Sequence, residues 1–237
     1  MKSDSAIISF IDNFPVSASL KEADTGRYLV NNLYNSRQFG VSNPKDLVGL
    51  RIQDLRFNQP EWGKRYATMI ERLDSRAREK KSHVLGRHQF LDDSGEAQLE
   101  EMVKFPVLGS RGKILGIVTY RHDITQTLPP SSLYRLYRNF YDTANAIKRT
   151  LVCLEIDQYF FKPPTNAQFQ VFLLKAERFT NKGIAKFLGT SDRTVECHLE
   201  ALRNKIIDGN LSQALTLLKW NTHALAIQSA AEDCADS

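Results

Sequence analysis

Cysteine is scarce in this sequence, and long apolar runs are absent. The three cysteines of the 237 residues are Cys153, Cys197 and Cys234. They are too few and too scattered for a disulfide framework or a zinc knuckle, so they are expected to be reduced thiols. No apolar run approaches the roughly 20 residues that cross a bilayer. The N-terminus also lacks the ordered charged and apolar segments of a signal peptide. The expected location is therefore cytoplasmic.

Motifs that carry catalysis are also lacking. The sequence contains no nucleotide-binding glycine loop, metal-binding cluster or nucleophile–base motif, so no enzymatic activity and no catalytic or metal-ligating residue is expected. The N-terminal segment has no acidic cluster of the kind that accepts a phosphoryl group at strand ends. Internal repeats and low-complexity tracts are missing as well. These absences leave a binding or regulatory protein.

The composition is that of a globular protein with charge gathered in one region. Hydrophobic residues make up 42% and charged residues 25%, and the length suits two modest cores. Residues 160–220 hold nine Lys or Arg and five Asp or Glu, whereas residues 221–237 form an acidic tail with Glu232, Asp233 and Asp236. The net charge of +5 gives weak support for an anionic partner.

Local signals predict a helix-turn-helix between residues 164 and 220. Thr165 opens a helix that runs through Ala176, and Thr180 caps a short helix over residues 181–188. Gly189 supplies a tight conformation at the end of that helix, and Ser191 caps the next one at once. Two helices joined by so short a turn must cross, which is helix-turn-helix geometry.

The next helix, expected over residues 192–207, has two faces. Its core side carries Val195, Leu199, Leu202 and Ile206. Its polar side carries Arg193, Glu196, Cys197, Glu200, Arg203 and Asn204. A polar face is usually only solvated, but directly after such a turn a helix can enter a major groove. A last helix over residues 211–220 closes an all-α four-helix unit.

This region resembles the LuxR-type DNA-binding domain. The resemblance is carried by Asn181-Lys182-Gly183-Ile184-Ala185, Gly189-Thr190-Ser191, Arg193-Thr194-Val195 and His198-Leu199. It implies phosphate contacts from Lys, Ser and Thr, and base reading by the polar helix face. The DNA-binding residues that it implies are Lys182, Thr190, Ser191, Arg193, Thr194, Glu196, Cys197, Glu200, Arg203 and Lys205.

Departures from the family pattern leave an alternative open. Ala167-Gln168 stands where the family usually has Arg-Glu, Arg178 stands where glycine is usual, and Gly183 replaces an acidic residue. Glu196 and Glu200 bring negative charge to the reading face, although Glu can accept a hydrogen bond from cytosine. The alternative function is a non-enzymatic adaptor that uses a degenerate helix-turn-helix domain for protein–protein contacts.

The first half of the chain predicts a small α+β domain. Three strands, over residues 84–91, 96–107 and 114–121, are joined by short turns and form an antiparallel meander. A charged helix over residues 61–81 precedes them, with an apolar face of Trp62, Tyr66, Met69, Ile70 and Leu73.

Residues 10–126 resemble a PAS domain through the order and spacing of these pieces, and residues 24–32 look like the first hairpin of that family. The family commonly binds a small molecule or a partner between sheet and helices, and the residues proposed to line such a pocket are Tyr28, Phe39, Met69, Phe90, Val118 and Tyr120. They could equally be core residues, and the domain could equally serve dimerisation. The segment has no cysteine for a flavin adduct. His83 and His88 are misplaced for haem, so the cofactor is unknown.

Residues 127–163 connect the two parts as a helical linker. After Pro129-Pro130, one helix is expected over residues 131–151, with an apolar stripe of Leu133, Leu136, Tyr137, Phe140, Ala144, Ile147 and Leu151. The stripe makes it a candidate dimerisation helix, or it packs on the sheet. The whole then predicts a homodimeric transcriptional regulator in which a small-molecule or partner signal at residues 10–126 controls binding of double-stranded DNA by residues 164–220.

Overall fold

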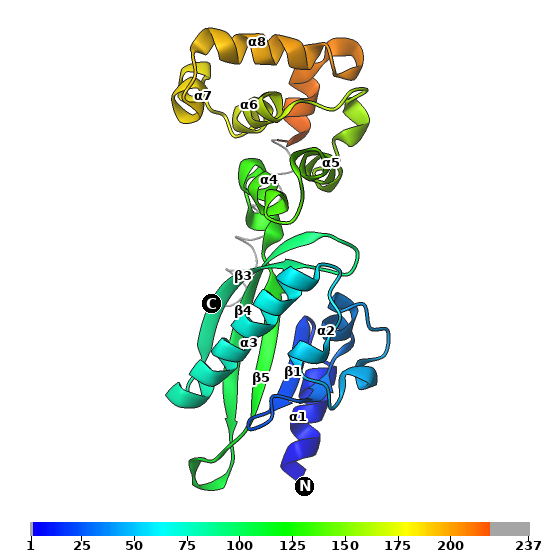
Figure 1. The fold of residues 1–237 in the computed structure, drawn as a ribbon, viewed down its shortest axis with the longest axis vertical. Coiled ribbons are helices and arrows are strands. Elements are labelled where there is room, and N and C mark those ends of the chain that lie inside the picture. The colour runs from blue at the N-terminus through cyan, green and yellow to red at the C-terminus, as the bar shows by residue number, and fades with distance from the viewer. Residues whose placement is uncertain (1, 219–237) are drawn as a thin grey trace. The chain divides into compact units, whose positions relative to one another are not determined.

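The computed structural model describes residues 2–218 and divides the chain after Ile124 into two compact units. Figure 1 shows the elements of each unit. The expected acidic tail, residues 221–237, and the last two residues of the helix expected over 211–220 lie outside the described residues.

The first unit is built on a five-stranded antiparallel sheet. Its strands are β1 (Ser17–Glu22), β2 (Tyr28–Asn31), β3 (Val84–Leu91), β4 (Ala97–Leu108) and β5 (Ile114–Asp123), in the order β2-β1-β5-β4-β3. The predicted hairpin and meander are therefore confirmed. The first strand, β1, pairs with the last strand, β5, in the middle of the sheet. This order, with helices between β2 and β3, is the PAS-like arrangement.

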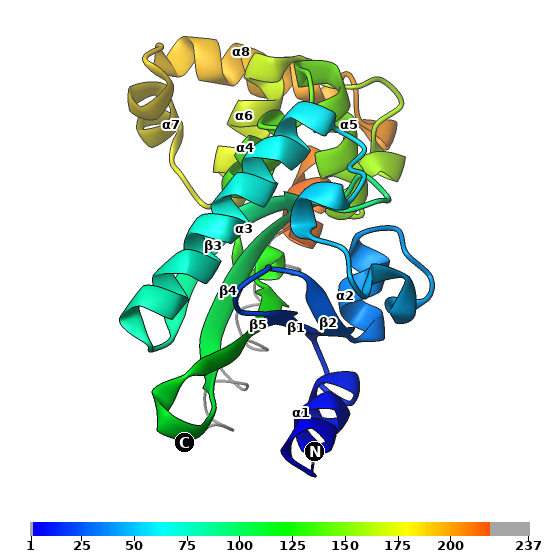
Figure 2. The ribbon, with the colours of Figure 1, turned by 60° about the horizontal axis from the view of Figure 1, so that its bottom comes forward.

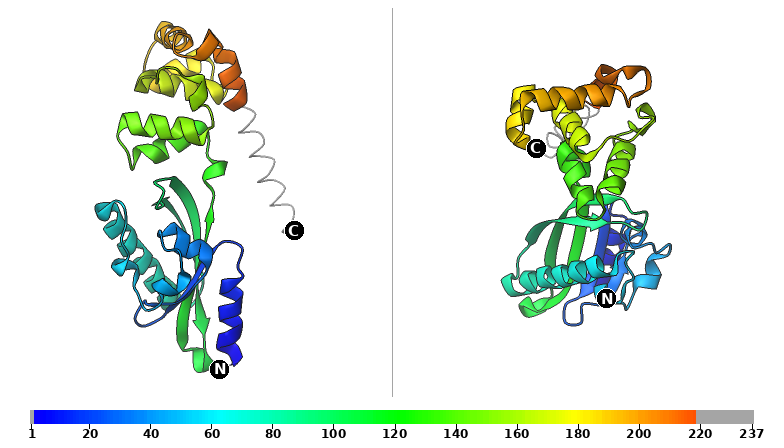
Figure 3. Two further views of the ribbon diagram at one scale, coloured as in Figure 1. Left: turned by 90° about the vertical axis from the view of Figure 1, so that its right-hand side faces the viewer. Right: turned by 45° about the horizontal axis from the view of Figure 1, so that its top comes forward.

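Helices cover both faces of this sheet. The helix α3 (Pro60–Lys80) packs on one face with Tyr66, Ile70 and Leu73, together with Phe90 and Met102 of the strands. The helix α2 (Leu33–Gln38) and the 3-10 turns η1 (Pro44–Leu47) and η2 (Ile52–Asp54) come before α3. Figure 2 shows α3 crossing in front of the strands. On the other face lies α1 (Lys2–Asp12), as the left view of Figure 3 shows.

The second unit is helical. Its helices are α4 (Pro130–Arg138), α5 (Thr143–Cys153), α6 (Asn166–Ala176), α7 (Asn181–Leu188) and α8 (Asp192–Arg203), and residues 211–218 are also helical. Short 3-10 turns lie at η3 (Ser110–Gly112) in the first unit and at η4 (Thr125–Thr127), η5 (Asp157–Tyr159) and η6 (Ile207–Gly209) in the second. The interior of the second unit holds Phe169, Phe172, Leu199 and Leu202, all buried. Within residues 2–218, no helix is long and apolar enough to cross a membrane.

The prediction of one helix over residues 131–151 is wrong. The segment forms α4 and α5, because Asn139 ends the first helix and the carboxylate of Asp142 accepts a 2.9 Å hydrogen bond from the Asn145 N–H and starts the second. Most of its apolar stripe is buried within the same unit, where Tyr134 meets Phe169 edge to face at 5.0 Å between ring centroids. Most of the stripe therefore covers the core of its own unit, although Phe140 is half-buried and Ala144 is exposed.

The helix expected over residues 192–207 is shorter than predicted. α8 ends at Arg203, with Asn204 as its C-cap, and Ile206 is extended and forms a bridge with Phe160. The apolar period continues through Ile206 although the helix does not. Ile206 is buried from this extended position, which periodicity alone could not distinguish from a fourth turn.

Candidate nucleic-acid interface and sensor cavity

Side-chain caps fix both helices of the turn. The hydroxyl of Thr180 accepts a 3.1 Å hydrogen bond from the Gly183 N–H at the start of α7. Gly189 ends α7 in the left-handed region, with φ of 65°, where glycine carries no steric penalty. The hydroxyl of Ser191 then accepts a 3.1 Å hydrogen bond from the Thr194 N–H and starts α8. The expected helix-turn-helix is present in this form.

α8 has one buried face and one exposed face, as its sequence predicts. Val195, Leu199 and Leu202 are buried against the unit's core. The exposed side carries Arg193, Glu196, Cys197, Glu200 and Arg203. Two guanidinium groups and two carboxylates thus share a surface that contains the one cysteine on this helix.

The residues implied as phosphate ligands lie in two places. Lys182, Ser191 and Thr194 sit at the N-terminal ends of α7 and α8, where backbone N–H groups and the helix dipole favour anions. Thr190 lies between those two ends. Lys205 follows α8, and its ammonium group donates a 3.1 Å hydrogen bond to the Pro163 carbonyl. Burial and nearby Lys162 lower the pKa of Lys205.

A small cavity lies inside the first unit, between the sheet and the helices. Its volume is about 10 Å³. It is lined by Ser19, Lys21, Tyr28, Asn35, Phe39, Ile52, Tyr66, Ile70, Met102, Lys104, Thr119 and Arg121. Of the predicted pocket residues, Tyr28 and Phe39 line it, whereas Met69 and Phe90 belong to the neighbouring apolar cluster.

Val118 and Tyr120 do not belong with the other predicted pocket residues. They pack with Ile11 and Phe14 beneath α1, on the opposite face of the sheet. The reason is the alternation of side chains along β5, which turns Thr119 and Arg121 toward the cavity and their neighbours away from it. Choosing pocket residues on β5 by apolar character alone therefore picked Val118 and Tyr120, which lie on the face opposite the cavity.

Charged side chains that the sequence reasoning missed line this cavity. The carboxylate of Asp74 accepts hydrogen bonds from the ammonium groups of Lys21 at 3.1 Å and Lys104 at 2.6 Å. Lys104 also donates a 3.1 Å hydrogen bond to the Thr119 hydroxyl. The two lysines are 3% and 1% exposed. A signal existed in the sequence, because Glu100, Met102 and Lys104 share one face of β4 by their spacing of two.

The buried charges of the two lysines and Asp74 shift one another's pKa values. Burial lowers the pKa of Lys104 to about 8, more than Asp74 raises it. Burial also opposes ionisation of Asp74, but the ammonium groups of Lys104 and Lys21 outweigh it and lower the pKa of that carboxyl group. For Lys21, burial is outweighed by Tyr28 and Asp74, so its pKa is raised.

A second buried network balances Arg121. Its guanidinium group lies 3.5 Å from the Glu100 carboxylate and donates hydrogen bonds to the Tyr66 hydroxyl at 2.9 Å and to Asn35 Oδ1 at 2.6 Å. Nε2 of His88 lies 2.9 Å from Oε2 of Glu100. His88 is thus a buried partner of a carboxylate. Within the part of the chain that the structure describes, no group of three or more His, Cys, Asp or Glu side chains is placed to hold a metal ion.

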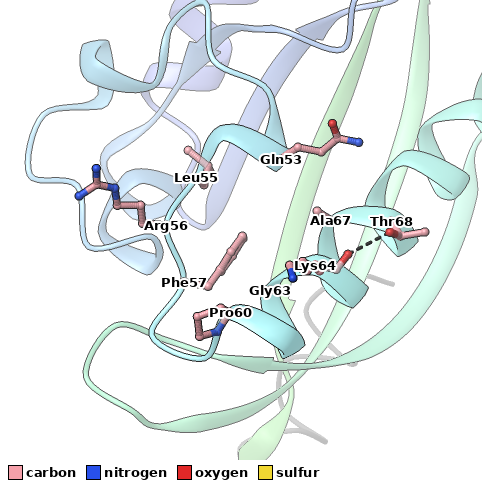
Figure 4. Close-up of a pocket in the computed structure, with 9 residues that line it drawn as sticks. All are labelled: Gln53, Leu55, Arg56, Phe57, Pro60, Gly63, Lys64, Ala67 and Thr68. Atoms are coloured by element: carbon pink, nitrogen blue, oxygen red, sulfur yellow. Dashed lines mark hydrogen bonds between the residues drawn. The ribbon is translucent and has the colours of Figure 1, made fainter.

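A larger open groove of about 610 Å³ lies where α3 begins (Figure 4). Leu55 and Phe57 of the preceding loop line it, together with Pro60, Gly63 and Ala67 of α3. A Cβ atom at Gly63 would overlap the Phe57 ring, so this glycine lets the loop pack closely on the helix. The cation of Lys64 on this groove is paired with Glu61 at 2.9 Å.

Known proteins resemble the chain in sequence over one part and in fold over most of it. Residues 165–218 match the family model described as bacterial regulatory proteins, luxR family. A structure described as a complex of Vibrio cholerae VqmA with ligand and DNA has a TM-score of 0.53 and 18% identity, covering 92% of this chain and 88% of that one. A phage VqmA–DPO complex has a TM-score of 0.50 and 21% identity, covering 91% and 86%. No curated protein matches the chain.

Proposed function

Since residues 165–218 are a LuxR-type DNA-binding domain, we propose that the chain is a transcriptional regulator that binds specific double-stranded DNA through α8 and responds to a small molecule in its PAS-like unit. The turn from Gly189 to Ser191 is the observation that carries this proposal. It places only three residues between the end of α7 and the start of α8 and leaves one side of α8 free of the unit's core. The folds it resembles belong to regulators, and no catalytic activity is proposed.

In this proposal α8 lies in the major groove. Lys182, Ser191 and Thr194 hold phosphates beside the groove and fix the position of the helix, while Glu196, Cys197 and Glu200 meet base edges. Arg193 and Arg203, on the same exposed side, offset the two carboxylates. We expect modest affinity, because each glutamate lies close to phosphate charge.

Binding to two half-sites requires a two-fold dimer with its recognition helices about 34 Å apart. Since most of the stripe of α4 and α5 is buried, the dimer is proposed to form on the first unit instead. There α1 exposes Phe10 by 57% and Ile8 by 43%. Phe10 also begins a row of aromatic rings that continues through Phe14, at 5.0 Å, to Tyr120, at 5.6 Å.

Control by a small molecule is proposed to act at the cavity beneath α3. Its position between the sheet and the helices, and its lining by Tyr28, Phe39 and Tyr66, support this role. The fold is also shared with VqmA proteins whose structures are described with a bound ligand. A ligand that binds one arrangement of the unit better than another shifts the population of DNA-competent dimers.

The exposed glutamates also favour the adaptor function, in which the helix-turn-helix contacts another protein. Binding of the full chain to random duplex DNA over a range of salt concentrations separates the two. A DNA-binding protein gives a steep fall of log K with log salt, about 0.9 per phosphate contacted. Absence of binding at low salt by the folded protein would rule out the DNA-binding proposal.

A charge reversal on the exposed face of α8 tests whether this helix itself faces DNA. Glu196→Lys should raise affinity for random DNA several-fold at low salt and steepen the salt slope by about one contact. Glu79→Lys, on an exposed site of α3 in the other unit, changes the net charge equally and is the matched control. Equal effects of the two variants would mean that α8 does not face DNA.

A further inference from the structure

The cavity beneath α3 holds an imbalance of charge. Two buried ammonium groups, those of Lys21 and Lys104, share the single carboxylate of Asp74. The third buried cation, Arg121, has Glu100 as its own partner. Burying a charge without full compensation is unfavourable, so the lysine pair has an unmet need for negative charge.

The wall of the cavity itself is cationic. Lys21, Lys104 and Arg121 all line it, and no Asp or Glu is among its lining residues. Asp74 reaches the lysines from the outer side: its side chain is 13% exposed, and it lines a separate open pocket of about 240 Å³ together with Lys21 and Arg78. Among residues 2–218, the one carboxylate paired with these lysines therefore lies between the inner cavity and an outer pocket.

From this arrangement we propose that the cavity binds a small organic anion, whose carboxylate replaces that of Asp74 between Lys21 and Lys104. The inference rests on the sensor function proposed above and adds the chemical class of the ligand. The rings of Tyr28, Phe39 and Tyr66 on the same wall suit an aromatic or otherwise apolar body.

The size of the cavity sets a mechanical requirement on binding. A volume of about 10 Å³ admits roughly one water molecule, so side chains must move to admit a ligand. Asp74 has room to turn into the outer pocket. Arg78, one helical turn further along α3, lines the same outer pocket, where its guanidinium group donates hydrogen bonds to the Ala23 carbonyl at 2.8 Å and the Ser75 hydroxyl at 3.0 Å. Anion binding is thereby coupled to a change of partners along α3.

The protonation of Lys104 agrees with this geometry. Its pKa is lowered to about 8 by burial, although Asp74 lies 2.6 Å away. One shared carboxylate thus does not hold this ammonium group fully charged. A ligand carboxylate that meets Lys104 from the cavity side would favour its charged form, while Asp74 stays close by on the outer side.

The test compares small carboxylates with their neutral isosteres on the full chain without DNA. Benzoate, 4-methylbenzoate and hexanoate are each paired with the corresponding primary amide, and the shift of the thermal unfolding midpoint is followed as the concentration rises. A carboxylate should raise the midpoint in a saturable way, and its amide should not. Equal shifts for acid and amide, or no saturable shift with any of the acids, would overturn the proposal.

Variants locate the effect. Lys104→Met should remove the benzoate shift, while Lys113→Met, on the exposed turn between β4 and β5, should keep it. Asp74→Asn removes the competing carboxylate and should strengthen benzoate binding about tenfold. If Lys104→Met does not fold, Asp74→Asn decides: weaker or unchanged binding there contradicts the exchange of carboxylates. DNA binding is measured separately, so failure of the anion test leaves the DNA-binding proposal intact.

Discussion

Gly189 ends one helix and Ser191, two residues later, caps the next. Gly189 has φ of 65° and donates its N–H to the Ala185 carbonyl, and Ser191 accepts from the Thr194 N–H. One residue, Thr190, separates the two positions. The crossing of α7 and α8, and with it the exposure of the polar face of α8, depends on this pair.

Gly189→Ala should lower the free energy of unfolding by about 1 kcal/mol, because an alanine in the left-handed region is strained even where nothing lies near its Cβ. Gly183→Ala in the first turn of α7 is the matched control. There the gain in helix propensity meets a 3.3 Å contact with the Thr180 hydroxyl, so the change should stay within about 0.5 kcal/mol. Urea denaturation measures both. Equal losses would mean that backbone strain at Gly189 is not the cause.

Ser191 has two roles that substitutions can separate. Ser191→Ala removes the cap and should cost about 1 kcal/mol of stability. Ser191→Asp keeps a good cap and should leave stability nearly unchanged, yet it should weaken DNA binding because a carboxylate replaces a phosphate ligand. Denaturation curves and DNA titrations on the same preparations test the pair. Unimpaired DNA binding by the aspartate variant would exclude Ser191 from the interface.

The stability of the protein should rise between pH 8 and 10. The pKa of Lys104 is lowered to about 8 from 10.5, so between these values the unfolded chain binds more protons than the folded one. Stability therefore increases with pH there, by at most about 3 kcal/mol. Above pH 10 the gain is offset, because burial raises the pKa of Tyr66 and the unfolded chain ionises first.

Denaturation at pH 8, 9 and 10 measures this rise. Lys104→Met should flatten it, and Lys113→Met should not. The raised pKa of Lys21 affects stability only above its ordinary value of 10.5, outside this window. A profile that is the same with and without Lys104 would show that this lysine is not held in a cationic cavity.

Phe10→Asp should weaken the proposed dimer by at least tenfold without unfolding the chain, since this ring is 57% exposed on α1. Phe187→Asp makes the same change at a ring that is 62% exposed on α7, and should leave the assembly unchanged. Sedimentation at several concentrations gives the dissociation constants. A monomeric parent protein, or the same loss in both variants, would contradict a dimer formed through α1.

Much of the fold could be predicted from signals between neighbouring residues. Thr180, Gly189 and Ser191 act within a few residues of themselves, so their caps and the turn could be predicted from the sequence. The meander was predictable for the same reason, since strands and turns alternate along residues 84–121. The break between α4 and α5 was not, because the apolar period runs through Asn139 and Asp142 without interruption. The N-cap at Asp142 starts a new helix even though the apolar residues keep helical spacing across it.

By itself, the sequence determined the helix-turn-helix and the exposed polar face of α8, because capping and helical period are properties of neighbouring residues. Only the tertiary structure decided where the apolar stripe of residues 131–151 is buried, and that Val118 and Tyr120 lie away from the cavity. It alone brought Asp74 to Lys21 and Lys104, which stand 53 and 30 residues from it along the chain. Contacts over such separations follow from strand pairing and helix packing, which no local pattern specifies.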